Sequence, residues 1–311
     1  DCNRDVRYRA LEALYNVVKC IRSSILIYLD EIFDAIIRMC EDSDLSIREA
    51  SNLVDKLIKD IIIECPTFNI VSLIEIIRER IYALTPNTRK LILSWISFLD
   101  SVPDIDLMIF VQDILDGLLK ISCDSNSDIR RTAETILNEF YIKIQDDNER
   151  VEFKPLIKIL LIHVQTDSIL VQSISLRWLC QCIKLADRVD ILYNSSQILA
   201  AILPCLSYAR LENNAHEEND ENSKSLQKRN TEMAKSLNEE LMNLVTKFKY
   251  DTLLNSPTVI KPEDNSFQFD NAASAATTTA TVISHSSHSK VVEEEPFKIS
   301  KILIVLVNEL E

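Results

Sequence analysis

The stretch DLSIREASNLVDKLI, residues 44–58, decides the fold because it returns along the chain at a fixed interval. The stretches TPNTRKLILSWISFL (85–99) and NSDIRRTAETILNEF (126–140) align with it without gaps. Five copies align on one position, here called the anchor, which falls at residues 7, 48, 89, 130 and 172, in steps of 41, 41, 41 and 42. A period of this length predicts a stack of similar supersecondary units.

Each copy opens with a residue suited to cap a helix. Four positions before the anchors stand Asn3, Asp44, Thr85, Asn126 and Ser168. We expect each side-chain oxygen to accept a hydrogen bond from a free N–H at the helix start. Small or apolar residues recur mainly three, six and ten positions after the anchors, which is one face of a helix. Seven positions after the anchor the other copies carry Leu or Ile, whereas the second carries Asp55.

A second set of amphipathic helices is expected between these first helices. Their ranges are about 25–39, 69–83, 105–121, 153–166 and 196–208. Each period is then helix, turn, helix, which is typical of HEAT and armadillo repeats. The predicted fold is an all-α solenoid of helix pairs.

The domain organisation follows from where the repeat stops. The expected segments are repeats over 1–210, an acidic loop insertion at 211–228, a further repeat helix at 229–250, a low-complexity disordered linker at 251–296 and a truncated next repeat at 297–311. Because the pattern begins and ends close to a helix, we expect an internal fragment of a longer protein.

Composition excludes several classes of function. The net charge is −14, which argues against nucleic acid or an anionic membrane as the main direct partner. Gly117 is the single glycine, so glycine-rich nucleotide loops and nucleophile elbows cannot form. No apolar run is long enough to predict a membrane span. The eight cysteines lie in apolar helical stretches, which predicts reduced, buried thiols in a cytosolic compartment.

Histidines and cysteines offer no metal or catalytic site by pattern. His163 stands on an apolar helix and is expected to be structural. His285 and His288 form an HxxH pair inside the expected linker, where no rigid helix holds them. Cys180 and Cys182 point about 200° apart on a helix, so buried packing is the better interpretation. No cofactor is expected.

Asp55 and the two tryptophans are the remaining candidates for functional residues. Asp55 is expected to pair with a neighbouring Lys or Arg. The enzyme alternative requires a cleft that pairs Asp55 with a second carboxylate. Trp95 and Trp178 stand at core offsets and are expected to be buried. We therefore expect no catalytic residues.

Seven strings along the chain form an ordered series. They are Leu53–Asp60, Arg78-Glu79-Arg80-Ile81-Tyr82, Ser94-Trp95-Ile96, Ser101-Val102-Pro103-Asp104-Ile105, Ile114-Leu115-Asp116-Gly117-Leu118, Ile162-His163-Val164-Gln165-Thr166 and Leu203-Pro204-Cys205-Leu206. Together they resemble one family, the HEAT-repeat scaffold of the vacuolar and endosomal complex that makes phosphatidylinositol 3,5-bisphosphate. The resemblance covers roughly residues 1–250.

The resemblance implies a non-catalytic scaffold. Such a protein binds and regulates a phosphatidylinositol 3-phosphate 5-kinase through its N-terminal repeats. It binds a Sac-type phosphoinositide phosphatase and self-associates mainly through regions beyond Glu311. The implied location is the cytosolic face of vacuole and endosome membranes, reached peripherally through partners. The linker 251–296 has no counterpart in the family pattern.

The kinase is expected to contact short turns and one charged ridge. The turns are 40–46, 83–88, 101–106 and 123–128. The expected contact residues are Asp42, Asp44, Arg78, Arg80, Asn87, Asp104, Asp106 and Asp124. The run Arg78-Glu79-Arg80 has the alternative of a simple solvated face. The alternative function is a nuclear-transport or protein-phosphatase adaptor solenoid, which predicts exposed acidic or Asn/Trp ladders on the second helices.

Overall fold

The computed structural model describes residues 3–65, 68–147, 149–207 and 221–255, and this part of the chain forms helices and turns without a strand. The all-α prediction is confirmed. The chain divides into two compact units, Asp1–Leu241 and Met242–Glu311. The second unit is described only over residues 242–255, the C-terminal part of helix α11. The repeats belong to the first unit.

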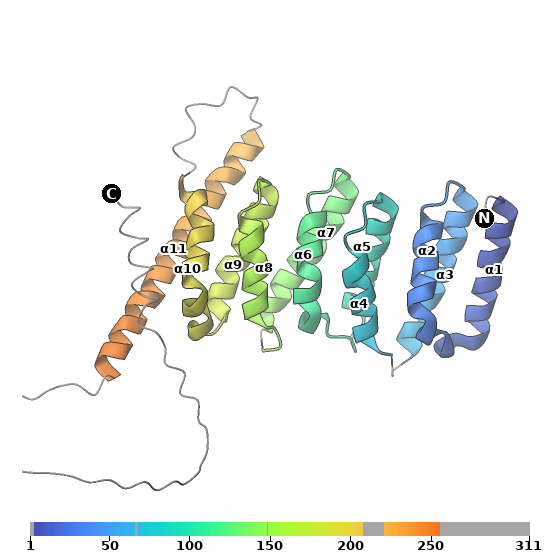
Figure 1. Ribbon diagram of the computed structural model, residues 1–311, viewed down its shortest axis with the longest axis horizontal. Helices are drawn as coiled ribbons and strands as arrows, with labels where there is room; N and C mark the ends of the chain where they lie inside the picture. Colours follow the sequence, from blue (N-terminus) through green and yellow to red (C-terminus); the bar gives the residue numbers. More distant parts are fainter. Residues whose placement is uncertain (1–2, 66–67, 148, 208–220, 256–311) are drawn as a thin grey trace, which may run out of the picture. The chain divides into compact units, whose positions relative to one another are not determined.

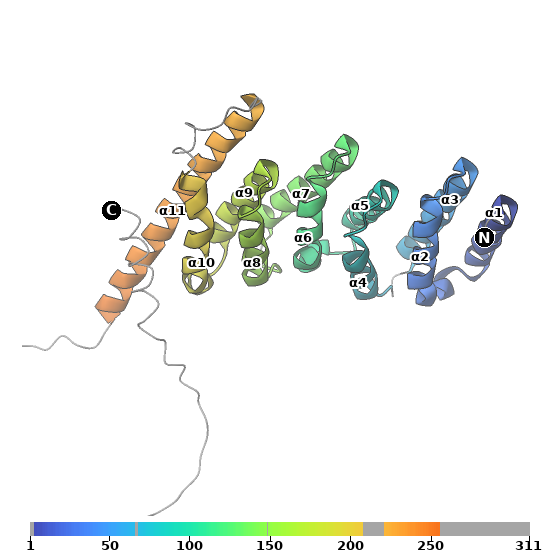
Figure 2. The same ribbon diagram turned by 45° about the horizontal axis from the view of Figure 1, so that its top comes forward.

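Helix pairs succeed one another along the first unit in chain order (Figure 1). The first helices form one layer and the second helices the other, as Figure 2 shows. The first helices are α1 (Arg4–Ile21), α3 (Leu45–Glu64), α5 (Pro86–Ser101), α7 (Ser127–Asp146) and α9 (Ile169–Leu185). The second helices are η1 (Arg22–Tyr28) with α2 (Leu29–Cys40), α4 (Ile70–Arg80), η2 (Leu107–Phe110) with α6 (Val111–Ile121), α8 (Phe153–Val164) and α10 (Arg188–Ser207), and α11 (Glu221–Asn255) follows.

The five expected N-caps all occupy the N-cap position, but only three cap through their side chains. Asn3, Asp44 and Asn126 accept a hydrogen bond from the N–H two residues ahead. Thr85 and Ser168 make no such bond, so that prediction was wrong for them. The Thr85 hydroxyl donates to Thr88 Oγ1 at 2.8 Å, and Ser168 Oγ accepts from Cys123 Sγ at 2.9 Å. These two hydroxyls have neighbours that compete with the backbone N–H.

This difference between caps can be measured. Asn126→Ala removes the bond from the Asp128 N–H and is expected to cost about 1 kcal/mol of unfolding free energy. Ser168→Ala, the matched control, removes no cap bond and is expected to cost a few tenths. Urea unfolding followed by circular dichroism compares the two. Equal losses would contradict the assignment of these caps.

Two helix starts differ from the prediction. Helix α10 begins at Arg188 rather than near residue 196, because Asn194 and Ser195 bond back to the Asp190 and Leu192 carbonyls within the helix. Helix α11 begins at Glu221, inside the stretch 211–228 expected to be a loop. Glu, Lys and Gln are good helix formers, so a polar composition did not exclude a helix there. Residues 208–220 and 256–311, including the HxxH pair, lie outside the described part.

Helix α10 contains a long apolar segment that the search for membrane spans in the sequence missed. Among the described residues, Arg188–Leu206 is the one segment long and apolar enough to cross a membrane by length and composition. In the structure α10 packs on α8, and Ile198, Ala201 and Ile202 are fully buried. Its apolar composition is accounted for by its place in the repeat stack.

The core runs between the two layers and contains both tryptophans. Trp95 and Trp178 are 0% and 1% exposed, as predicted. The expectation of buried thiols holds for Cys40, Cys182 and Cys205, whereas Cys65 and Cys180 are half-buried and Cys20 and Cys123 are exposed. Cys20 lies near the end of α1, and Cys123 lies in the turn between α6 and α7, where its Sγ donates to Ser168 Oγ.

Gly117 lies inside helix α6 and brings it close to the end of α4. A Cβ atom built on Gly117 would stand 2.6 Å from Ile81 Cδ1, closer than real carbon atoms approach. Ile81 is itself 1% exposed. The single glycine is therefore required by close packing between two repeats and not by a turn.

Candidate partner interface

Three of the anchor arginines donate hydrogen bonds to the turn that precedes their helix pair. Arg48 Nη1 donates to the carbonyls of Asp42 and Ser43 at 2.6 and 3.1 Å. Arg130 Nη1 donates to Asp124 and Ser125 in the same way, at 2.7 and 3.1 Å. Arg89 repeats the pattern on Ala83 and Leu84. The sequence interval predicted the helices, but it did not reveal this role of the anchors.

Asp42 and Asp124 lie in the same turns and accept hydrogen bonds from anchor arginines of the preceding repeat. Arg7 donates to Asp42 at 2.6 Å, and Arg89 pairs with Asp124. Their side chains are only 7% and 2% exposed. The bond from Arg7 lowers the pKa of Asp42. Burial alone would raise the pKa of Asp124, but the Asn126 N–H and Arg89 outweigh it and lower that pKa. Both carboxylates thus join neighbouring repeats.

The other expected contact residues are dispersed. Asp44 caps α3 and pairs with Arg4, Arg78 pairs with Asp113, Arg80 pairs with Asp30 and Asp34, Asn87 donates to Glu41, and Asp106 caps η2 and pairs with Arg150. Asp104 is exposed. Three of the four turns join one helix pair to the next, namely 40–46, 83–88 and 123–128. The turn 101–106 instead follows the C-terminal end of α5, within one pair. The structure does not gather them into one site, and their contact with a partner stays a prediction.

Asp55 lies beside a basic side chain, as expected. Its Oδ2 accepts from Lys59 at 2.8 Å, and its Oδ1 accepts from Trp95 Nε1 at 2.7 Å. The Lys59 ammonium also lies 4.8 Å from the centre of the Trp95 ring. The cluster explains why a carboxylate replaces Leu or Ile here: it satisfies an indole N–H that would otherwise be buried without an acceptor. Trp178 shows the contrast, because Leu137 takes that position and the Trp178 Nε1 has no acceptor among the described residues.

A second polar cluster connects α6, α8 and the turn after α4 through Asp116 of α6. Tyr82 donates to its Oδ2 at 2.5 Å and Lys120 at 2.8 Å. His163 Nε2 lies 2.7 Å from Oδ1 and must donate, because a carboxylate only accepts. His163 is 3% exposed, so the prediction of a structural histidine is confirmed. Sequence reasoning missed Asp116 and Tyr82, although both lie in the family-like strings.

The cluster makes stability depend on pH in acid. Burial would raise the pKa of Asp116, but bonds from Lys120, Tyr82 and His163 outweigh it and lower the pKa to about 2. Because the pKa of Asp116 is lower in the folded chain than its ordinary value near 4 in the unfolded chain, the ionised carboxylate stabilises the fold at pH values above about 4. This stabilisation, about 2 kcal/mol, is lost as the pH falls from about 4 to about 2. Asp116→Asn is therefore expected to be less stable than the unchanged chain at pH 7. The difference should shrink toward pH 2 in urea unfolding, whereas a constant difference would contradict this origin.

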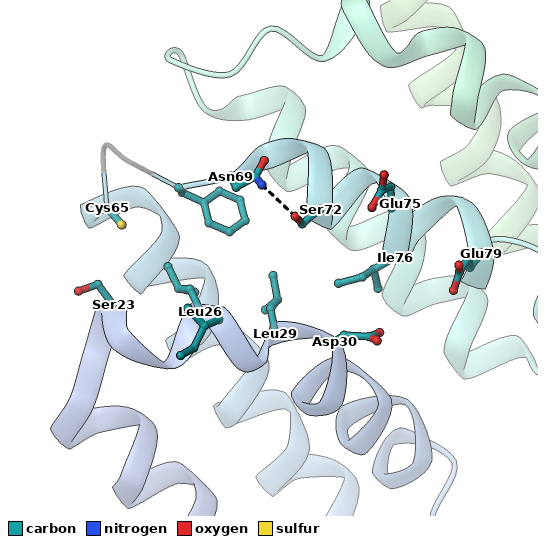
Figure 3. A pocket seen from close by; sticks show the side chains of 12 residues that line it. Ser23, Leu26, Leu29, Asp30, Cys65, Asn69, Ser72, Glu75, Ile76 and Glu79 are labelled. Atoms are coloured by element: carbon teal, nitrogen blue, oxygen red, sulfur yellow. Dashed lines mark hydrogen bonds between the residues drawn. The ribbon is translucent and has the colours of Figure 1, made fainter.

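A groove between the first two helix pairs was not predicted at all (Figure 3). Its volume is about 610 Å³, and it lies between η1 and the start of α2 on one side and α4 on the other. Leu26, Leu29 and Ile76 point into it, and Asp30, Glu75 and Glu79 stand along one end. The sequence signal that could have found it is the run Ile25-Leu26-Ile27-Tyr28-Leu29, which is too apolar for one buried face alone.

No group of three or more His, Cys, Asp or Glu residues in the described ranges could hold a metal ion.

Comparison with known proteins identifies the relatives. The family model described as the vacuolar 14 Fab1-binding region matches residues 1–60. A protein named VAC14 homolog from Arabidopsis thaliana is 37% identical over 207 residues, 67% of this chain and 28% of that protein. A VAC14 homolog from Schizosaccharomyces pombe is 24% identical over 358 residues, 87% of this chain and 42% of that protein.

The third relative is the vacuole morphology and inheritance protein 14 of Saccharomyces cerevisiae, 29% identical over 176 residues, 44% of this chain and 20% of that protein. The crystal structure of an engineered protein matches 76% of this chain and 93% of its own at 13% identity, with a TM-score of 0.32. The match to this chain spans less than half the length of each of these three relatives. The matches to the VAC14 proteins and to their Fab1-binding region show that the chain belongs to the VAC14 family.

Proposed function

We propose that the chain is part of a non-catalytic scaffold that binds and regulates a Fab1-type phosphatidylinositol 3-phosphate 5-kinase. The observation that carries this proposal is the match of residues 1–60 to a Fab1-binding region. Those residues form α1, η1, α2 and most of α3, which is the N-terminal end of the repeat stack. A stack of helix pairs presents extended surfaces suited to a large protein partner.

The scaffold acts by bringing enzymes together. A partner held on the same protein has a high effective concentration for its neighbour, and no chemistry by the scaffold is needed. In this proposal the whole protein also holds a Sac-type phosphatase and controls phosphatidylinositol 3,5-bisphosphate. It lies peripherally on the cytosolic face of vacuole and endosome membranes and self-associates. The acidic chain reaches the membrane through its partners.

The adaptor alternative receives no support from the tryptophans. It predicts exposed acidic or Asn/Trp ladders on the second helices, whereas both tryptophans lie on first helices and are buried in the core. No specific observation favours nuclear-transport cargo or a protein-phosphatase subunit as the partner.

An affinity pull-down tests the proposal. The 311-residue chain is immobilised, membrane and cytosolic extracts are passed over it, and bound proteins are identified by mass spectrometry. We expect a Fab1-type kinase among the specifically retained proteins. Retention of transport cargo or protein-phosphatase subunits without the kinase would overturn the proposal and leave the fold unchanged.

A further inference from the structure

We propose that the groove between η1, α2 and α4 is where the kinase docks, through a helix with one apolar face flanked by Lys or Arg. This inference rests on the proposed function and adds the position of the contact and the chemistry of the partner segment. Five of the twelve residues that line the groove, between Ser23 and Asp30, fall inside the matched Fab1-binding region, and the other seven come from the next repeat.

The groove has an apolar floor with an unpartnered apolar edge. Leu29 and Ile76 are 5% and 8% exposed and close the floor. Beside them Ile27 is 78% exposed, and it also lines the groove. When a partner covers an aliphatic side chain that is so exposed beside an apolar floor, the burial of apolar surface stabilises the complex.

The charge of the groove is negative at one end. Asp30, Glu75 and Glu79 line it, and no Lys or Arg is among its lining residues. Arg80 is shared among Asp30, Asp34 and Glu79, so one guanidinium faces three carboxylates. Glu75 is exposed and makes no ion pair within the described ranges. This excess of negative charge is complementary to a segment that carries Lys or Arg.

The walls of the groove favour a helix as the occupant. Both walls are helices, whose backbone groups bond internally, so they offer no free strand edge for an extended peptide. Apolar grooves between helices bind amphipathic helices through side chains spaced three and four residues apart.

The backbone at the groove is also unusual. Arg22, which joins α1 to η1, has φ 44 and is the one described non-glycine residue with positive φ. The 3-10 segment that follows is seven residues long, whereas such helices seldom exceed four residues. Strained backbone held by its surroundings is concentrated at binding sites. Ile27 lies within this 3-10 segment and is exposed.

Paired substitutions test the docking site. Ile27→Ser and Glu75→Lys, combined in the 311-residue chain, alter two exposed side chains and leave the core intact. The matched control combines Ile162→Ser, 65% exposed on α8, with Glu232→Lys on α11. Binding to purified Fab1-type kinase is measured by biolayer interferometry. We expect the groove variant to weaken binding about tenfold or more and the control to bind as the unchanged chain does.

The outcomes separate this inference from the proposed function. If the unchanged chain binds the kinase and the groove variant binds equally well, the docking site is wrong and the scaffold function stands. If the unchanged chain does not bind, the proposed function itself fails. If the groove variant instead changes the self-association of the chain in light scattering without affecting the kinase, a second copy is the occupant and the inference is overturned.

Discussion

Replacing Gly117 with valine is expected to destabilise the first unit by about 3 kcal/mol or more, because two helices meet at this residue without space for a side chain. Even the first carbon of a side chain would overlap Ile81, which is fully buried at the end of α4. Valine adds two further methyl groups in the same place. The free energy of unfolding in urea measures the effect. Ala200→Val, on the exposed side of α10, is the control and is expected to cost less than 1 kcal/mol.

A double-mutant cycle shows whether Ile81 is the cause. Gly117→Ala alone is expected to destabilise by about 1–3 kcal/mol despite the higher helix propensity of alanine. In the background of Ile81→Ala, which removes all three overlapping carbon atoms, the same change should become favourable. The coupling between the two sites is then of the order of 1–3 kcal/mol. Additive effects would contradict the close-packing explanation.

Replacing Trp95 with alanine is expected to cost about 3–5 kcal/mol, since it removes one of the two tryptophan side chains of the core and leaves a cavity. The ring lies 5.3 Å from Phe33 and 5.7 Å from Phe98, centre to centre, so aromatic packing on both sides is lost. Asp55 also loses its indole donor and is left with Lys59.

A milder change isolates the polar part of this loss. Trp95→Phe keeps most of the apolar contact and removes the donor, and the expected cost is about 1–3 kcal/mol. Adding Asp55→Leu, the residue type found at position 137, should recover part of that loss because neither partner of the indole bond is then left unpaired, while Lys59 keeps its bond to Ser94 at 2.9 Å. Thermal and urea unfolding compare the three variants. A double variant that loses the full sum of the single costs would show that Trp95 and Asp55 do not act together.

The repeat architecture was predictable because its signal is repeated. One helix start is a weak signal, but five N-cap residues in steps of 41 or 42 residues reinforce one another. The starts of α10 and α11 were harder to predict because the anchor pattern marks only the first helix of each pair and ends with the fifth copy. There the polar residues Asn194 and Ser195 imitate a loop while being satisfied inside a helix.

The interface could be predicted only in part. The charged turn residues were visible in the sequence, yet Asp42 and Asp124 are used within the chain, bonded to arginines 35 residues away. Such long-range pairing does not follow from local pattern. Ile27 falls inside the amphipathic helix expected over about 25–39. It lies instead in the 3-10 segment Arg22–Tyr28 and is exposed, and backbone geometry of this kind has no sequence periodicity.

The most direct measurement of the central claim is a binding titration between the purified 311-residue chain and a purified Fab1-type kinase. We expect a saturable complex whose affinity falls as the salt concentration is raised, because the groove of the acidic chain recognises basic side chains. Hydrogen exchange in that complex should slow over residues 22–30 and 69–80. Absence of binding at micromolar concentrations, with both proteins folded, would contradict the account.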